Sequence, residues 1–326
     1  MNSVIITAFN EAMYLKSSLN ALLASIHDPT EIIVVDDASA DDTKAVIGDR
    51  KDILYLRIPK RAGVAFCRNF GSALAKGDDF CYLDAHVWPR DGATDKLCLA
   101  ARTHDAIIGA AIVTVNVHPN RVGNAWQNAV DGAETLPVNR AQSMCFARHK
   151  SWFYMSVERH PDADLERRSG CYACGSTMSR KIYERIGGWL SLPGKWSGND
   201  VAMSTKAWFM DIPILAEQRA HIAHAQKTVR CHETSRQDQV LNKAYTAKVC
   251  FDEDTFRDFW LPGFKRCYGW SEWLDKELES PTLLAEQEAF KAKKLKTDSA
   301  FMETFVVPAL RKTGRSEDWR QLWKAH

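Results

Sequence analysis

The segment Phe80-Cys-Tyr-Leu-Asp84-Ala-His86-Val87 stands at the centre of the pattern that decides the fold of this chain. Its apolar first half predicts a buried strand, which ends in a carboxylate and an imidazole two positions apart. Side chains two apart on a strand point to the same face. Asp84 and His86 can therefore hold one divalent cation from one side, leaving positions for water or a phosphate. The alternative is that His86 is an ordinary turn histidine.

The hundred residues around this segment alternate between apolar strands and amphipathic helices. We expect strands at 4–7, 31–35, 53–57 and 80–83, and helices at 10–25, 43–47 and 63–76. This alternation predicts an α/β fold with a mostly parallel, doubly wound sheet whose ligands lie at the carboxyl ends of the strands.

Polar residues follow three of these strands: Asn10-Glu11, Asp36-Asp37, and then Asp84 with His86. Any one of them could be a helix cap or turn residue, and for Asn10 or Asp36 taken alone that is the better interpretation. Together they predict a nucleotide pocket closed by a metal.

The later sequence predicts the rest of one α/β domain and a helical appendage. We expect this domain over residues 1–250, with a first part at 1–105 and a second part at 106–250. Within it, helices are expected at 180–186 and 201–210 and a short strand at 212–215. Residues 251–326 are charged and rich in tryptophan, and we expect them to form a helical C-terminal extension.

Composition narrows the class of protein. The chain has 326 residues, 45% hydrophobic and 26% charged, and a net charge of +2, so bulk electrostatics favour no partner. No apolar run reaches 18 residues, and a strand begins at once, so we expect no signal peptide, no membrane contact and a cytoplasmic location. The nine cysteines fit a reducing compartment. For Cys171-Tyr-Ala-Cys174, buried free thiols are favoured over a zinc or redox pair.

These residues resemble the GT-A fold glycosyltransferases. The resemblance rests on residues 4–11, 32–37, 63–77 and 83–86, and the Asp-x-His form is similar to that of the polypeptide N-acetylgalactosaminyltransferases. It extends through Trp196-Ser-Gly-Asn-Asp200, His221-Ile-Ala-His224 and residues 242–252. It covers roughly residues 1–255.

The resemblance implies a Rossmann-like GT-A sheet and a metal-dependent glycosyltransferase that uses a UDP-sugar. It makes residues 1–250 the catalytic domain, with a nucleotide-sugar half at 1–105 and an acceptor half at 106–250. Its metal ligands fall on Asp84, His86 and His224, with His221 as the alternative third ligand. Such mixed carboxylate and imidazole ligation suits Mn²⁺ best, with Mg²⁺ as the second choice.

Further residues acquire expected roles from the same resemblance. Asp200 is the expected catalytic base, with Asn199 beside it, although Asp200 could also cap the helix that follows. Trp196 could line the sugar pocket or belong to the core, and Arg68 could contact the donor or be a solvated helix residue. The residues expected to bind the donor are Ala8, Asn10, Glu11, Asp36, Asp37, Gly63, Arg68, Asp84 and Trp196. The Asn199-Asp200 order departs from the family pattern, so retention and inversion both stay open.

The acceptor is less defined than the donor. We expect a hexose or N-acetylhexosamine to pass to a hydroxyl group. Basic and aromatic residues interleave between Arg140 and Arg185. Such a pattern can follow a phosphate backbone and stack bases, but a solvated surface around a core aromatic cluster is the favoured interpretation of it. A hydroxymethylated DNA base is the preferred acceptor, because the chain is similar to viral DNA glycosyltransferases in being compact, anchor-free and mildly basic. A polypeptide Ser/Thr or a glycan is the alternative acceptor. A sugar-phosphate nucleotidyltransferase is disfavoured, because the loop Ala8–Glu11 lacks the glycine and lysine of a phosphate loop.

Overall fold

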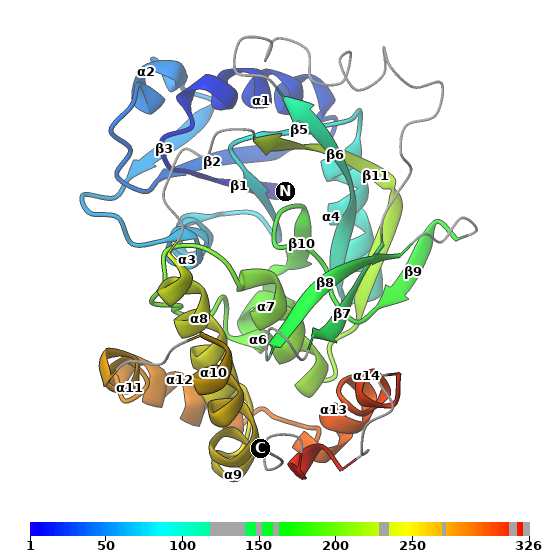
Figure 1. Ribbon diagram of the computed structural model, residues 1–326. Helices are drawn as coiled ribbons and strands as arrows, with labels where there is room; N and C mark the ends of the chain where they lie inside the picture. Colours follow the sequence, from blue (N-terminus) through cyan, green and yellow to red (C-terminus); the bar gives the residue numbers. More distant parts are fainter. Residues whose placement is uncertain are drawn as a thin grey trace.

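The computed structural model describes residues 1–117, 141–147, 152–158, 163–227, 235–268, 272–312 and 318–321. A nine-stranded sheet has the order β3-β2-β1-β4-β10-β6-β11-β5, with β9 beside β11, and β7 and β8 form a separate hairpin (Figure 1). The strands are β1 (Asn2–Ala8), β2 (Thr30–Asp36), β3 (Ile53–Arg57), β4 (Asp79–Asp84), β5 (Val87–Pro89), β6 (Ile107–Val117), β7 (Ala141–Ala147), β8 (Trp152–Glu158), β9 (Leu165–Arg168), β10 (Ser176–Ser179) and β11 (Ile214–Lys227).

The first four strands are parallel and end together. Ala8 pairs with Asp36 across β1 and β2, and Thr7 pairs with Asp84 across β1 and β4. The polar residues that follow these strands therefore meet at one edge of the sheet, as the sequence predicts.

Helices cover both faces of this sheet, which is why its strands are apolar throughout. On one face, Val4 and Ile6 share a cluster with α1 (Ala12–Ser25), α2 (Thr43–Ile47) and α4 (Ala93–His104). On the other face, Ile5 packs toward α3 (Val64–Leu74), α6 (Arg180–Ile186) and α7 (Asn199–Phe209). Alternate side chains of β1 thus serve two cores.

The middle of the chain makes the sheet mixed. Strand β10 runs antiparallel between β4 and β6, and β11 runs parallel to β6 along its whole length. The short strand expected at 212–215 is instead the beginning of β11, which continues through His221 and His224. Pairing with the 11-residue strand β6 extends it across a register shift between Glu217 and His221.

The C-terminal region is helical, as predicted, and it shares a core with the sheet domain (Figure 1). Phe301 stacks on Phe209 of α7 with ring centroids 5.0 Å apart, and Trp152 lies 4.9 Å from Trp260. Helix α8 (Arg236–Cys250) precedes this region. Its segments are α9 (Glu253–Thr255), the π-helix η3 (Phe256–Trp260), α10 (Leu261–Tyr268), α11 (Glu272–Glu277), α12 (Pro281–Lys291), α13 (Asp298–Phe305), α14 (Val307–Arg311) and the short 3₁₀ turn η4 (Trp319–Gln321). Within the described ranges, no helix is long and apolar enough to span a bilayer.

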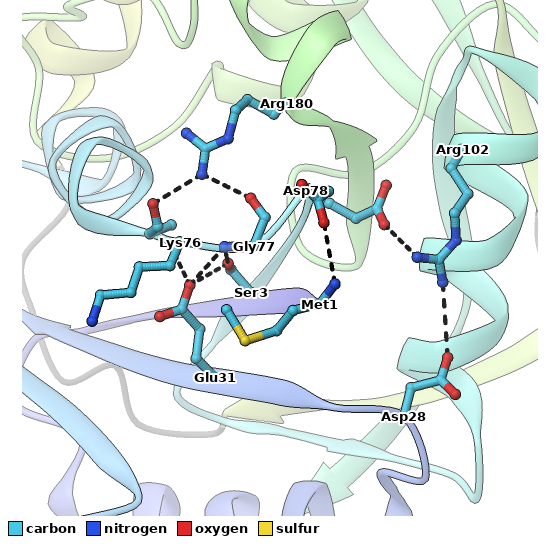
Figure 2. Close-up of polar contacts among 11 residues, drawn as sticks. Met1, Ser3, Asp28, Glu31, Lys76, Gly77, Asp78, Arg102 and Arg180 are labelled. Carbon is cyan, nitrogen blue, oxygen red and sulfur yellow. Dashed lines mark hydrogen bonds and ion pairs between the residues drawn. The ribbon is translucent and has the colours of Figure 1, made fainter.

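Two aromatic residues of the basic and aromatic segment belong to this core. Trp152 and Phe153 on β8 are 1% and 3% exposed. Arg180 is also structural, because its guanidinium donates to the carbonyls of Ala75 and Gly77 (Figure 2). It also lies over the ring of Phe80. These contacts fit the aromatic-core interpretation, and residues 148–151 and 159–162 lie outside the described part of the chain.

Candidate active site

A cavity of about 610 Å³ opens at the carboxyl ends of β1, β2 and β4, which is within the range of about 300–1,000 Å³ usual for small-ligand sites. It contains most of the residues expected from the sequence. Those that line it are Ala8, Glu11, Asp37, Arg68, Asp84, His86, Trp196, Asn199, Asp200 and His224. Residues far apart in the sequence thus meet in a single concave site.

Asp84, His86 and His224 form a group that could hold a metal ion. One ligand atom from each lies within 4.8 Å of the other two. The Asp84 carboxylate is 3.6 Å from His224 Nε2 and 4.0 Å from His86 Nε2. β4 ends at Asp84, so His86 is presented by the turn before β5 and not by the strand on which the spacing argument placed it.

Strand β11 brings His224 to this group. His224 pairs with Val87 of β5, and the Ala225 N–H donates to the His86 carbonyl, which joins the turn to β11. Successive side chains of a strand alternate between faces, so His221, three positions earlier, points away from the face that carries His224. The structure therefore places His224 beside Asp84.

Glu11 orients His86. Its carboxylate lies 2.5 Å from His86 Nδ1, and the Glu11 side chain is 6% exposed. A carboxylate bonded to one ring nitrogen fixes the ring and leaves the other nitrogen to face a metal. The sequence placed Glu11 near the base and ribose of the donor, and the structure instead shows it engaged with a candidate metal ligand.

Arg68 links the candidate metal ligands to the wall of the cavity. It projects from α3, is 2% exposed, donates to Asp84 at 3.1 Å and lies 4.6 Å from the ring centroid of Trp189. Burial alone would raise the pKa of Asp84, but hydrogen bonding to His224 and the positive charge of Arg68 hold that pKa below its ordinary value. Nε and Nη1 of Arg68 are buried without a hydrogen-bond partner among the described residues. Arg68 lines the cavity and supplies positive charge to its wall.

Asn199 and Asp200 enter the cavity at the start of α7. Gly198 precedes the helix with a φ of 82°, a conformation that glycine adopts easily. The Asp200 carboxylate accepts from the Val201 N–H at 2.9 Å, and burial raises the pKa of Asp200. Asn199 is 6% exposed, and its Oδ1 has no partner in the described part of the molecule. The cavity thus contains a carboxylate of raised pKa beside an amide oxygen that can accept a hydrogen bond.

Three residues expected to bind the donor do not line this cavity: Asn10, Asp36 and Gly63. The Asp36 carboxylate binds the Tyr55 hydroxyl and Arg57, and Asn10 accepts from the Ala40 N–H. Asp36 also accepts from the Ser39 N–H at 2.8 Å, so both residues contact the loop after β2.

Asp37 and Gly63 are joined at the beginning of α3. The Asp37 carboxylate accepts from the N–H groups of Ala62 and Gly63 at 2.6 and 2.9 Å. At Gly63, φ is 97°, and a Cβ would lie 3.0 Å from Lys195 Cα, so a larger residue would be strained. Asp37 lines the cavity, whereas Gly63 shapes it through the backbone.

The sequence interpretation missed Arg61, Phe9, Tyr172 and Lys195, which also line the cavity. The Arg61 guanidinium lies 4.1 Å from the ring centroid of Phe9, which makes a flat cationic surface beside Asp37. Two of these residues had a signal in the sequence: Phe9 follows β1 directly, and Arg61 directly precedes Ala62-Gly63. Cys171 and Cys174 of the CxxC segment are both buried and are not joined by a disulfide.

A match to a known family shows to which family the chain belongs. Residues 3–187 match glycosyl transferase family 2, which is more than half of the chain. This chain is a member of glycosyl transferase family 2. Membership favours glycosyl transfer over the nucleotidyl transfer considered from the sequence.

Curated proteins similar to this family 2 member include polypeptide N-acetylgalactosaminyltransferases. Mouse polypeptide N-acetylgalactosaminyltransferase 3 is 24% identical over 282 residues, which cover 77% of this chain and 41% of the relative. A putative polypeptide N-acetylgalactosaminyltransferase 13 of Drosophila melanogaster is 26% identical over 224 residues, 63% of this chain and 38% of the relative. The chain therefore spans about two fifths of the length of these relatives.

Solved structures show the same fold. GalNAc-T7, determined with UDP, GalNAc and Mn²⁺, matches with a TM-score of 0.68 at 17% identity, covering 95% of this chain and 57% of that chain. S. aureus TarS 1–349, determined with UDP-GlcNAc, matches with a TM-score of 0.53 at 14% identity, covering 99% and 90%. The predicted GT-A fold and the predicted resemblance to the polypeptide N-acetylgalactosaminyltransferases are confirmed.

Proposed function

We propose that this family 2 member is a metal-dependent glycosyltransferase that takes a UDP-sugar as donor and transfers the sugar to a hydroxyl group. The observation that carries the proposal is the meeting of Asp84, His86 and His224 in one cavity with Arg68 and Asp200. Candidate ligands, a buried cation and a carboxylate of raised pKa are the groups that such a transfer needs.

The donor set fits a divalent cation. One carboxylate and two imidazoles would hold it, and Glu11 orients one of the imidazoles. Mn²⁺ suits this mixed set best, and Mg²⁺ is the second choice. The ion, when bound, supplies positive charge to the diphosphate of the donor. The determination of GalNAc-T7 with UDP and Mn²⁺ supports the same choice.

The chain's own residues bind and orient the donor. Arg68 supplies positive charge to a phosphate in the cavity, and its stacking on Trp189 keeps the guanidinium in place. The Oδ1 atom of Asn199 can accept a sugar hydroxyl. Arg61 over Phe9, beside Asp37, offers a flat surface and a polar edge to a base. Trp196, 38% exposed, borders the mouth of the cavity.

Asp200 is placed to act on the acceptor. In an inverting displacement its carboxylate takes the proton of the acceptor hydroxyl, and in a retaining reaction it holds that hydroxyl against the donor. Its raised pKa keeps it a stronger base than a solvated aspartate. The configuration of the product distinguishes the two roles.

We propose a polypeptide Ser or Thr hydroxyl as the acceptor. The names of the curated relatives support this choice. The prediction of a hydroxymethylated DNA base as acceptor drew on the basic and aromatic segment. Trp152 and Phe153 of that segment are buried in the core and unable to stack on bases. A DNA acceptor therefore serves as the competing outcome of the test.

The test measures UDP release and sugar transfer from a panel of UDP-sugars with Mn²⁺, Mg²⁺ or EDTA. Three acceptors are compared: Ser/Thr-rich peptides, the same peptides with alanine at those positions, and hydroxymethylated DNA. We expect metal-dependent release that rises with the Ser/Thr peptides alone. If release rises with DNA instead, DNA is the acceptor. If UDP is released from none of the donors under any condition, the proposal is overturned.

A further inference from the structure

Residues 188–198, here named the strap, run without regular secondary structure between α6 and α7. The last part of the strap borders the cavity: Lys195, Trp196, Ser197 and Gly198 all line it, and α7 then presents Asn199 and Asp200. The position of these two residues therefore depends on how the strap is held.

The strap is in a conformation that it does not adopt by local preference. Ser197 has a φ of 81°, in the left-handed region that residues with a side chain rarely occupy. Such a conformation costs on the order of 1–3 kcal/mol and persists where the surroundings impose it. Among the described residues, the most extensive set of hydrogen bonds to this part of the strap comes from Asn242.

Asn242 lies on α8 and is fully buried. Its Oδ1 accepts from the Gly194 N–H at 2.8 Å, and its Nδ2 lies 3.0, 3.1 and 2.8 Å from the carbonyl oxygens of Gly194, Trp196 and Ser197. One side chain thus bonds the backbone on both sides of Lys195, including the strained residue. Because these bonds are buried, each lost partner would leave a costly unpaired group.

The fit around Asn242 is close. A Cβ on Gly194 would lie 2.6 Å from the Asp238 carbonyl oxygen and 2.7 Å from Asn242 Oδ1, so the strap backbone lies directly against α8. The helical C-terminal region adds a second hold, since Glu286 of α12 accepts from the Ser191 N–H at 2.9 Å and from the Tyr245 hydroxyl at 2.8 Å.

We propose that Asn242 is a positioning residue for glycosyl transfer: its amide fixes the strap, and through it Trp196 and Asp200, in the geometry that the reaction needs. This inference rests on the proposed function and adds a residue that does not line the cavity and does not touch the candidate metal ligands. Displacement of a catalytic group by about 1 Å can cost on the order of a hundredfold in rate, so a loosened strap should lower turnover while metal binding stays intact.

The experiment compares Asn242→Asp, Asn242→Ala and Gln287→Ala. Asp has the size of Asn, but it places an oxygen where Nδ2 donates to three carbonyls. Gln287 is the matched control, because it is 5% exposed and its Nε2 donates to the Lys248 carbonyl at the far end of α8 from the strap. All variants are assayed at a temperature where circular dichroism shows them folded.

We expect both Asn242 variants to lose about tenfold or more in kcat, with the Kd for Mn²⁺ within about twofold of wild type. Gln287→Ala should keep kcat within about twofold. Wild-type kcat in Asn242→Asp would show that the residue only fills space, and an equal loss in Gln287→Ala would show a general effect of destabilisation. Either result would overturn the inference.

Hydrogen exchange separates this inference from the proposed function. Backbone amides of residues 195–200 should exchange faster in both Asn242 variants than in wild type or Gln287→Ala. If the wild-type protein transfers no sugar, the proposed function is wrong. Hydrogen exchange alone would then test whether Asn242 fixes the strap. Unchanged exchange in both Asn242 variants would overturn the inference even with an active enzyme.

Discussion

Asp79 begins strand β4 and Asp84 ends it, and the pKa values of the two carboxylates shift in opposite directions. Asp79 is 1% exposed, and burial raises its pKa although Arg102 donates to it at 2.8 Å. At Asp84, burial acts in the same direction but is outweighed by His224, Arg68 and His86, which lower the pKa. Position on an apolar strand is thus not enough to define a site.

The two ends of the sheet differ in what their polar groups surround, although both keep buried polar atoms without a partner among the described residues; Asn2 Nδ2 and Asp79 Oδ1 are two such atoms at the amino end. At the amino end, Glu31 accepts from the Ser3 hydroxyl and the Gly77 N–H, and Arg102 spans Asp79 and Asp28 (Figure 2). These contacts join the first residues of β1, β2 and β4 to α4 and to the loops that precede β2 and β4. At the carboxyl end, several side chains converge on Asp84 while Arg68 and Asn199 keep polar atoms without a partner in the described part of the chain. Convergence of candidate metal ligands and a buried cation on one cavity, and not the presence of unpaired polar atoms, marks the candidate ligand site.

The largest expected effect contrasts the two aspartates directly. Asp84→Asn should lower turnover about a thousandfold and weaken Mn²⁺ binding, because it removes the negative candidate ligand. Asp79→Asn should keep turnover within about twofold, since Asn can still accept from Arg102. Steady-state kinetics and Mn²⁺ titration of the two folded variants measure this. Equal losses in both would remove the functional distinction between the ends of β4.

A smaller effect concerns Asp200 at the carboxyl end. The base must be ionised, so its raised pKa predicts that kcat/KM falls on acidification at a higher pH than the ordinary aspartate value of 3.8. Asp200→Asn should lose about a hundredfold in kcat and also lose this acid limb. A pH profile of wild type and variant from pH 4 to 9 is the measurement. An unchanged acid limb in Asp200→Asn would assign it to another group.

The smallest effect is on stability at the amino end. Because the folded pKa of Asp79 lies above the unfolded value, the native state binds the proton more readily than the unfolded state as pH falls through that folded pKa. Wild type should therefore gain stability relative to Asp79→Asn on acidification from neutral pH toward 3.8. Urea unfolding of both proteins at several pH values measures the difference. Asp42→Asn, at an exposed position, is the control, and a trend of the opposite sign would show that Arg102 outweighs burial.

Much of the fold could be predicted from the sequence because its signals are local. Continuous apolar runs marked β1 to β4, helical spacing of apolar residues marked the helices between them, and the helix expected at 180–186 is α6. The Asp84-Ala-His86 spacing marked the edge of the sheet where the cavity lies. Strand β11 was predicted too short, because its length comes from pairing with β6 and not from its own sequence.

The sequence by itself determined the order of the elements, the parallel half of the sheet and the acidic edge, since these follow from the periodicity and chemistry of neighbouring residues. Only the tertiary structure decided that His224 and not His221 meets Asp84, that Glu11 serves His86, and that Asp36 holds a loop. It also decided that Asn242 holds the strap. These outcomes depend on which strands and helices are neighbours in the fold. The periodicity of a segment does not reveal which distant residue its side chains will contact.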